Sequence, residues 1–194
     1  MTERVDMALI AALVPPGSHV LDLGCGNGEF LAYLRDQRRC TGYGVEIDDA
    51  NVLACTRRGV NVVQLNLEEG LALFDDQSFD VVLQIETLQH LRNTERMLRE
   101  TARVGRVGIV SFPNFAHWPN RLQVAAGRMP VTRTLPYQWY DTPNIRVGTY
   151  ADFEVLARKD GLRILDAFGI QGGAAVRRWP NLRASVAVFK FERG

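Results

Sequence analysis

Cysteine is scarce in this sequence. The 194 residues contain three, Cys25, Cys40 and Cys55, and none belongs to a Cys-x-x-Cys pair. An odd number without paired spacing indicates neither a disulfide framework nor a tetrahedral zinc site, so no metal is expected. Unpaired thiols persist in a reducing compartment, and we therefore expect a cytoplasmic protein.

An excess of charge of either sign is also lacking, because 23 Lys and Arg residues balance 22 Asp and Glu residues. This balance gives no broad attraction to nucleic acid or to an anionic membrane surface, and neither is an expected partner. No apolar run approaches the ~18 residues that a membrane-spanning helix needs. The N-terminal apolar run follows Glu3 and Asp6 and ends in Pro15-Pro16-Gly17, which is wrong for a secretory signal.

Short apolar runs rich in valine and isoleucine alternate with helical patterns along the chain. This alternation predicts one α/β domain over residues 1–194, with a mostly parallel sheet covered by helices. The run at 79–86 is almost uninterrupted, which is typical of a central strand buried on both faces. Helices are expected at 29–37, 49–59 and 93–105 and from near Thr149, and strands at 19–24, 42–48, 61–67, 79–86, 106–114, 162–170 and 184–192.

Residues 113–148 interrupt this alternation. The segment holds five prolines and an aromatic group made up of Trp118, Tyr137, Trp139 and Tyr140. Prolines at this density oppose regular elements, so we predict a long covering insert without helix or strand. It follows the carboxyl end of a strand, which is the side where open parallel sheets bind ligands.

The stretch "VLDLGCGNGEF" places Gly24, Gly26 and Gly28 at an expected strand-to-helix turn. Glycine permits unusual backbone angles and lets a ligand lie against the main chain, while the N-terminus of the following helix favours an anionic group. A dinucleotide fingerprint would require glycine where Glu29 stands, and a phosphate loop would end in Gly-Lys-Ser/Thr. Asp22 disfavours a pyrophosphate and suits a cationic sulfonium or ammonium group. The alternative is that the glycines only form a tight turn.

Two further side chains extend this candidate site. Glu46 and Asp48 end the second expected strand, at the distance where folds of this type place an acid against ribose hydroxyls. After the third strand, Asn66 can offer a donor and an acceptor to an adenine edge, although asparagine is also ordinary turn chemistry. Together these features predict a site for S-adenosylmethionine (SAM), which is an adenosine with a zwitterionic amino-acid tail.

The same residues carry a family resemblance. "VLDLGCGNGEFLAYL" with "GYGVEID" resembles the class I SAM-dependent methyltransferase superfamily. "SFDVVLQIETLQHLRN", "VSFPNFAHWPNRLQ", "GRMPVT" and "LPYQWYDTPNIRV" are similar to the MetW family of methionine biosynthesis proteins. The resemblance implies a three-layer Rossmann-like fold with a seven-stranded sheet that binds SAM or S-adenosylhomocysteine (SAH). It also implies a partner, homoserine O-acyltransferase of the MetX type.

The resemblance implies cofactor contacts residue by residue, and it places Gln84 and Ile85 near the reactive methyl group. It assigns no catalytic residue. The candidate cofactor-binding set is Asp22, Gly24, Cys25, Gly26, Gly28, Glu46, Ile47, Asn66, Leu67 and Gln84.

The sequence leaves the activity open between two functions. One is a SAM-binding accessory subunit of the acyltransferase, because none of the four serines lies in a Gly-x-Ser-x-Gly elbow for acyl transfer. The other is a methyltransferase for an unknown small molecule; nucleic-acid modification is disfavoured by charge. Three roles are open for the aromatic residues of the insert, which are to line a substrate pocket, to form a partner surface or to anchor the insert; the residues are Trp118, Trp139 and Tyr140. The sequence is also compatible with a homo-oligomer. Candidate bases are His90, His117, Tyr137, Tyr140 and Asp141.

Overall fold

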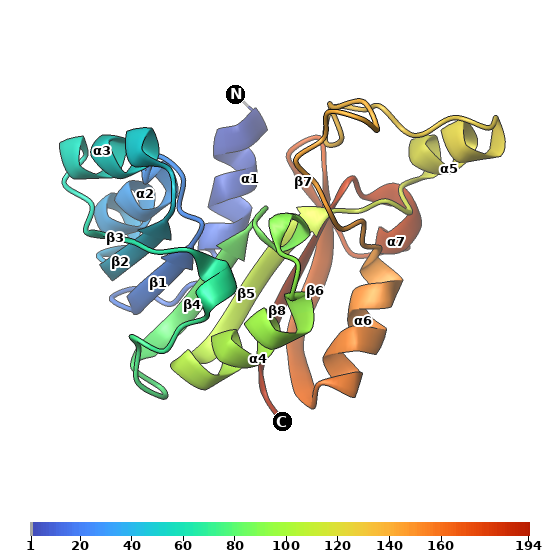
Figure 1. The fold of residues 1–194 in the computed structure, drawn as a ribbon. Coiled ribbons are helices and arrows are strands. Elements are labelled where there is room, and N and C mark those ends of the chain that lie inside the picture. The colour runs from blue at the N-terminus through green and yellow to red at the C-terminus, as the bar shows by residue number, and fades with distance from the viewer. Residues whose placement is uncertain (1) are drawn as a thin grey trace.

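The computed structural model describes the backbone of residues 2–194 and the side chains of residues 6–194. One eight-stranded sheet runs through it in the order β3-β2-β1-β4-β5-β8-β6-β7 (Figure 1). The strands are β1 (His19–Leu23), β2 (Thr41–Glu46), β3 (Val62–Gln64), β4 (Phe79–Ile85), β5 (Gly105–Pro113), β6 (Leu162–Gln171), β7 (Ala174–Val176) and β8 (Val186–Arg193).

The first five strands are parallel and the last three are not. Strand β8 pairs antiparallel with both β5 and β6, and β6 pairs antiparallel with β7. The predicted mostly parallel sheet is therefore confirmed, but seven strands is wrong by one. Gly172 and Gly173, with φ of 57° and 82°, form a two-residue turn that folds β7 back onto β6. A Gly-Gly pair between apolar residues is the sequence feature that predicts such a hairpin.

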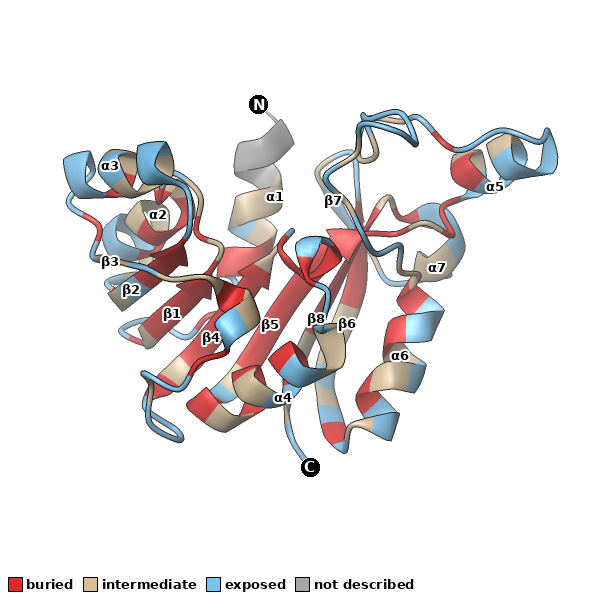
Figure 2. Cartoon of the chain, viewed as in Figure 1, coloured by how far each residue is buried: buried red, intermediate tan, exposed pale blue. Residues whose placement is uncertain are grey.

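Helices cover both faces of the sheet. Helices α1, α2 and α3 pack on one face, and α4 and α6 pack on the other, so that the strands between them are largely buried (Figure 2). The helices are α1 (Thr2–Ala11), α2 (Glu29–Arg38), α3 (Asp49–Arg57), α4 (Thr94–Val104), α5 (Trp118–Ala125), α6 (Tyr150–Lys159) and α7 (Pro180–Arg183), with 3-10 turns η1 (Leu67–Glu69) and η2 (Leu88–His90).

The insert at 113–148 leaves the sheet and returns to it at one point, where Asn114 pairs with Gly148. Most of it is irregular, as its prolines predict. The prediction of no regular element is wrong for α5, because Pro119 lies in the first turn of this helix, where a missing backbone N–H costs nothing. Helix α5 projects from the end of the molecule beyond β5 (Figure 1).

The ends of α4 and α6 differ in how they are capped. Thr149 caps α6, since its hydroxyl accepts a hydrogen bond from the Asp152 backbone at 3.1 Å. Asn93 precedes α4 but makes no side-chain cap. Gly105 follows α4 directly as the first residue of β5 with φ of −104°, so this helix ends by passing into extended chain.

Candidate functional site

The glycine-rich turn joins the carboxyl end of β1 to the start of α2. Gly24, Gly26 and Gly28 have φ of 74°, 54° and 76°, a left-handed region that other residues resist. A Cβ added to Gly24 would lie 2.6 Å from the Thr87 hydroxyl oxygen, and one on Gly28 would lie 2.9 Å from the Cys55 sulfur. A Cβ on Gly26 would meet nothing within 4 Å. The turn therefore packs tightly at its two ends and faces open space at its centre.

Glu46 ends β2 and its carboxylate lies against this turn. Oε2 accepts a hydrogen bond from the Gly26 backbone N–H at 2.8 Å, and Oε1 accepts from Ile47 and Asp48 at 2.8 and 3.0 Å. The side chain is buried. A carboxylate oxygen can accept two hydrogen bonds, so Oε2 keeps one position for a ligand hydroxyl. The structure thus brings Glu46 and Gly26 together, as their spacing predicts.

Asp22 lies beneath the same turn, near the end of β1. It is buried, and its Oδ1 has no hydrogen-bond partner among the described residues. Burial, and secondly the nearby charge of Glu46, raises the pKa of Asp22 to about 7. An unpaired buried carboxylate beside a second carboxylate favours a cation close by. This geometry suits the ammonium or sulfonium group of the predicted ligand.

Two residues that the sequence did not point to hold the turn in place. The Thr87 hydroxyl donates to the Leu23 carbonyl at 2.8 Å, directly before Gly24. The Cys55 thiol donates to the Gly26 carbonyl at 3.2 Å, and its sulfur lies 3.8 Å from that of Cys25. Burial raises the pKa of both thiols, so they remain protonated and act as packing groups. These contacts join residues far apart in the sequence, which is why local patterns do not reveal them.

The other predicted cofactor contacts differ in exposure and in their hydrogen-bond partners. Ile47 is exposed beside Glu46, and Leu67 is buried in the core. The Asn66 side chain accepts from the Glu68 backbone at 3.0 Å and caps η1, so its oxygen already serves as turn chemistry. Gln84 is fully buried and donates to the Thr101 hydroxyl of α4, and its contact with a cofactor stays a prediction. Strand alternation directs its side chain into the core.

A cavity of about 650 Å³ opens at the ends of β4 and β5, beneath the insert. Glu86, His90 and Tyr137 are among its lining residues. Glu86 directly follows β4 with φ of 54°, which is a strained conformation for this residue type. The His90 Nδ1 lies 3.1 Å from the Pro143 carbonyl, which can only accept, so this ring nitrogen is the donor.

The remaining candidate bases lie outside this cavity. His117 is buried at the start of α5, and burial lowers its pKa. Tyr140 and Asp141 are exposed. Among the aromatic residues of the insert, Trp139 and Tyr140 are each 71% exposed and Trp118 is 52% exposed. Such exposure does not fit an anchoring role in the fold.

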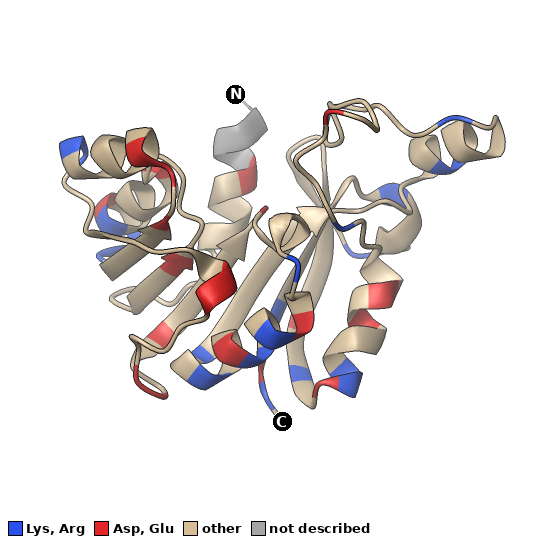
Figure 3. Cartoon of the chain, viewed as in Figure 1, with Lys and Arg blue, Asp and Glu red and all other residues tan. Residues whose placement is uncertain are grey.

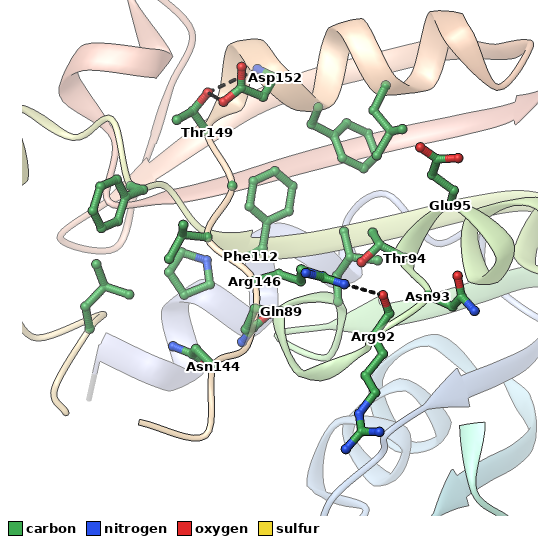
Figure 4. A pocket seen from close by; sticks show the side chains of 18 of the residues that line it. Gln89, Arg92, Asn93, Thr94, Glu95, Phe112, Asn144, Arg146, Thr149 and Asp152 are labelled. Atoms are coloured by element: carbon green, nitrogen blue, oxygen red, sulfur yellow. Dashed lines mark hydrogen bonds between the residues drawn. The ribbon is translucent and has the colours of Figure 1, made fainter. Parts of the chain in front are cut away.

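A second cavity, of about 450 Å³, lies between α4 and α6 (Figure 4). Phe112 and Phe153 are part of its apolar wall, and Arg146 and Glu95 are among its charged residues. No residue of the glycine-rich turn lines it. In the described part of the chain, no helix has the length and apolar character to cross a bilayer, and no cluster of His, Cys, Asp and Glu could hold a metal ion.

Comparison with known proteins identifies relatives over the whole chain. The family model for methionine biosynthesis protein MetW matches residues 4–191. The bifunctional methionine biosynthesis protein MetXA/MetW of Rhodopirellula baltica is 39% identical over 100% of this chain and 33% of its own length. The phthiotriol/phenolphthiotriol dimycocerosates methyltransferase of Mycobacterium tuberculosis is 34% identical over 47% of this chain and 35% of its own length. The chain thus spans about a third of these relatives.

Solved structures show the same fold at low sequence identity. A SAM-dependent methyltransferase of Thermotoga maritima, a possible histamine N-methyltransferase, gives a TM-score of 0.72 at 19% identity and covers 98% of this chain and 89% of its own. Magnesium protoporphyrin IX methyltransferase of Synechocystis PCC 6803, with bound SAH, gives a TM-score of 0.67 at 20% identity. The match covers 100% of this chain and 83% of that protein's chain. The predicted Rossmann-like methyltransferase fold is confirmed.

Proposed function

The chain belongs to the family of methionine biosynthesis protein MetW, and from this membership we propose that it is a SAM- or SAH-binding accessory subunit of homoserine O-acyltransferase. The observation that carries the proposal is the bifunctional relative, in which a region similar to this whole chain shares one polypeptide with a MetXA part. Two proteins that are fused in one organism are candidates for association in another.

The glycine-rich turn supports the ligand. Gly26 leaves its centre open, Glu46 offers one free acceptor position, and Asp22 has an unpaired buried oxygen. These groups match the main-chain approach, the ribose hydroxyls and the cationic tail of a sulfur-linked nucleoside. When bound, SAM would supply an electrophilic methyl group, while the chain's own residues would orient the nucleoside.

The exposed surface of the insert is evidence for the proposed protein partner. Several large apolar side chains of the insert, such as Trp139 and Tyr140, are exposed to solvent and are not part of the hydrophobic core. Exposed apolar surfaces of this kind mark interaction sites. The charge of the insert differs from that of the whole chain, because residues 113–148 contain one acid, Asp141, and four arginines, Arg121, Arg128, Arg133 and Arg146. Figure 3 shows that, by contrast, charges of both signs alternate along α4. An acidic partner surface with apolar depressions would complement this insert.

The decisive experiment measures the homoserine O-acyltransferase of the same organism. We expect its purified form to turn over faster when this protein is added, with saturation at a fixed stoichiometry. An equal amount of serum albumin is the control. An unchanged rate, together with no complex in sedimentation velocity, would contradict the accessory role.

A second candidate function is methyl transfer to a small molecule. The cavity beneath the insert favours it, because His90 and Tyr137 line a space next to the end of β4. Methyl transfer from a sulfonium depends mainly on proximity and alignment, so it requires no conspicuous base. Incubation with methyl-labelled SAM and a metabolite extract would then give a labelled product, which His90→Ala and Tyr137→Phe should reduce.

A further inference from the structure

We propose that the cavity between α4 and α6 is a second binding site, which takes a small apolar molecule ending in an anionic group. The cavity of about 450 Å³ has the size of sites that hold such molecules. It is separate from the glycine-rich turn, so the inference stands whether or not the chain binds SAM.

The cavity wall is apolar and comes from several elements. Leu88 of η2, Phe112 of β5 and Phe153 of α6 are buried side chains that line it, and Leu156 adds a partly buried one. Side chains fixed by the core do not need to be ordered when a ligand arrives. An aromatic or short acyl group therefore gains contact area at low entropic cost.

Gln89 supplies an unsatisfied acceptor. It is 8% exposed, its Nε2 donates to the Glu86 carbonyl at 2.7 Å, and its Oε1 has no partner among the described residues. Gln89 and Asn144 line both this cavity and the one beneath the insert, and Figure 4 shows them beside Arg146. A buried acceptor without a donor is destabilising, and a ligand N–H or O–H would supply the missing donor.

The charges of the cavity favour an anion. Glu95 is paired with Lys159 at 2.8 Å and with Arg99 at 3.4 Å, and Asp152 accepts from the Thr149 hydroxyl. Arg146 has no carboxylate partner within the described residues; one of its guanidinium nitrogens donates to the Arg92 carbonyl at 2.7 Å (Figure 4). Its other N–H groups remain for a carboxylate, sulfonate or phosphate.

The insert holds Arg146 in this position. The backbone N–H groups of Ile145 and Arg146 both donate to the Gln89 carbonyl at 3.0 Å. These hydrogen bonds fix Gln89 and Arg146 next to each other before any ligand binds, as expected of a preorganised site.

The test uses two dyes that differ by a single group. The probe 8-anilinonaphthalene-1-sulfonate has an aromatic body, an N–H donor and an anion, and N-phenyl-1-naphthylamine has the same body without the sulfonate. We expect saturable one-to-one binding of the sulfonate in fluorescence titrations of the intact protein. The neutral analogue should bind about tenfold more weakly, because it lacks the charged hydrogen bond to Arg146.

Two substitutions locate the probe. Gly148 lines the cavity, and a Cβ there would lie 3.4 Å from the Phe112 ring at an ordinary backbone angle, so Gly148→Leu should fill the space and abolish the saturable site. Arg146→Gln should weaken the sulfonate about tenfold and leave the neutral dye unchanged. Leu73→Ala removes an exposed apolar side chain away from the cavity and is the matched control. If Gly148→Leu does not fold by circular dichroism, Leu135→Trp fills the same cavity from the insert.

Three results would overturn the proposal. Equal sulfonate binding by wild type and by the folded cavity-filling variant would place the dye outside this cavity. Equal affinity for both dyes would remove the anionic requirement. Stoichiometric displacement of the sulfonate by SAH would place the dye at the glycine-rich turn.

Discussion

At the scale of single residues, Asp22 and Glu46 show how environment separates two like groups. Both are buried carboxylates that lie near one turn. Glu46 accepts three backbone hydrogen bonds, whereas Asp22 retains an unpaired oxygen. Burial therefore acts on Asp22 without compensation, and its pKa rises to about 7. Asp22 is the group in this site that responds to pH near neutrality.

Asp22→Asn should change the pH dependence of stability. Because the pKa of Asp22 is raised in the folded protein, the unliganded fold binds this proton more tightly than the unfolded chain does. Its stabilising contribution is complete below the unfolded pKa of 3.8 and is lost as the pH rises through about 7. The variant should therefore gain stability relative to wild type at pH 8 and lose this advantage towards pH 4. Urea unfolding at several pH values measures the difference, and a constant difference would contradict the assignment.

Glu46→Gln should weaken ligand binding. An amide cannot accept at both ends, so a backbone N–H of Gly26, Ile47 or Asp48 loses its partner. We expect SAH to bind about 1–3 kcal/mol more weakly in calorimetry, the usual cost of a lost buried hydrogen bond. Asp48→Asn is the matched control, because the Asp48 side chain already caps α3 by accepting from the Asn51 backbone at 2.9 Å and asparagine also caps helices well. Unchanged affinity in Glu46→Gln would remove Glu46 from the ribose site.

At the scale of elements, the helix ends show which local patterns are structural. Thr149 and Asn93 are both cap residue types, yet only Thr149 makes a side-chain cap bond. The difference arises because Asn93 has φ of −110° and ψ of 64°, outside the extended conformation typical of an N-cap. The residue type alone therefore does not establish a cap.

Thr149→Ala should destabilise the fold by about 1 kcal/mol, the typical cost of a lost N-cap. Asn93→Ala should change the free energy of unfolding by only a few tenths of a kcal/mol, because no cap bond is lost. Paired urea titrations compare the two. Equal losses in both variants would show that the cap bond does not stabilise α6 as described.

Most elements could be predicted because each strand of the parallel sheet is a compact apolar run. Helix α5 could not, because the prolines around it outweigh its one favourable position, and the three residues of β7 have no periodicity, so that only the Gly-Gly turn before them indicates this strand. Within the candidate site, spacing predicted that Asp22, Gly26 and Glu46 lie close together, as they do in the structure, while their contact with a ligand stays a prediction. The resemblance assigned Gln84 to the cofactor site, and its burial and its bond to Thr101 could not be predicted because that contact joins two distant segments.

At the scale of the whole molecule, the insert gives the protein two unlike regions. In Figure 2 the sheet is mostly buried and the insert is mostly exposed, and the exposed side chains of the insert include Trp118, Tyr137, Trp139 and Tyr140. Trp139 and Tyr140 pack edge to face with ring centroids 5.6 Å apart. A pair of this kind presents a rigid apolar surface with little side-chain entropy to lose.

The double variant Trp139→Ala with Tyr140→Ala should activate the acyltransferase more weakly. The concentration of this protein that gives half-maximal activation should rise at least about tenfold, because aromatic residues dominate interface energetics. SAH affinity and melting temperature should stay at wild-type values. Leu73→Ala is the control, because it removes a side chain of similar exposure from another surface. Unimpaired activation by the double variant would exclude these residues as the contact.

The hydrogen bonds of the segment after β4 connect the glycine-rich turn with the insert. Thr87 is bound to the chain just before the glycine-rich turn, and Gln89, two residues later, holds the insert through its carbonyl. Motion of the turn would thus reach the aromatic surface across a single short stretch of backbone. If the proposed nucleoside and the proposed partner bind at these two places, any effect of one on the affinity of the other must be matched by an equal effect in the opposite direction.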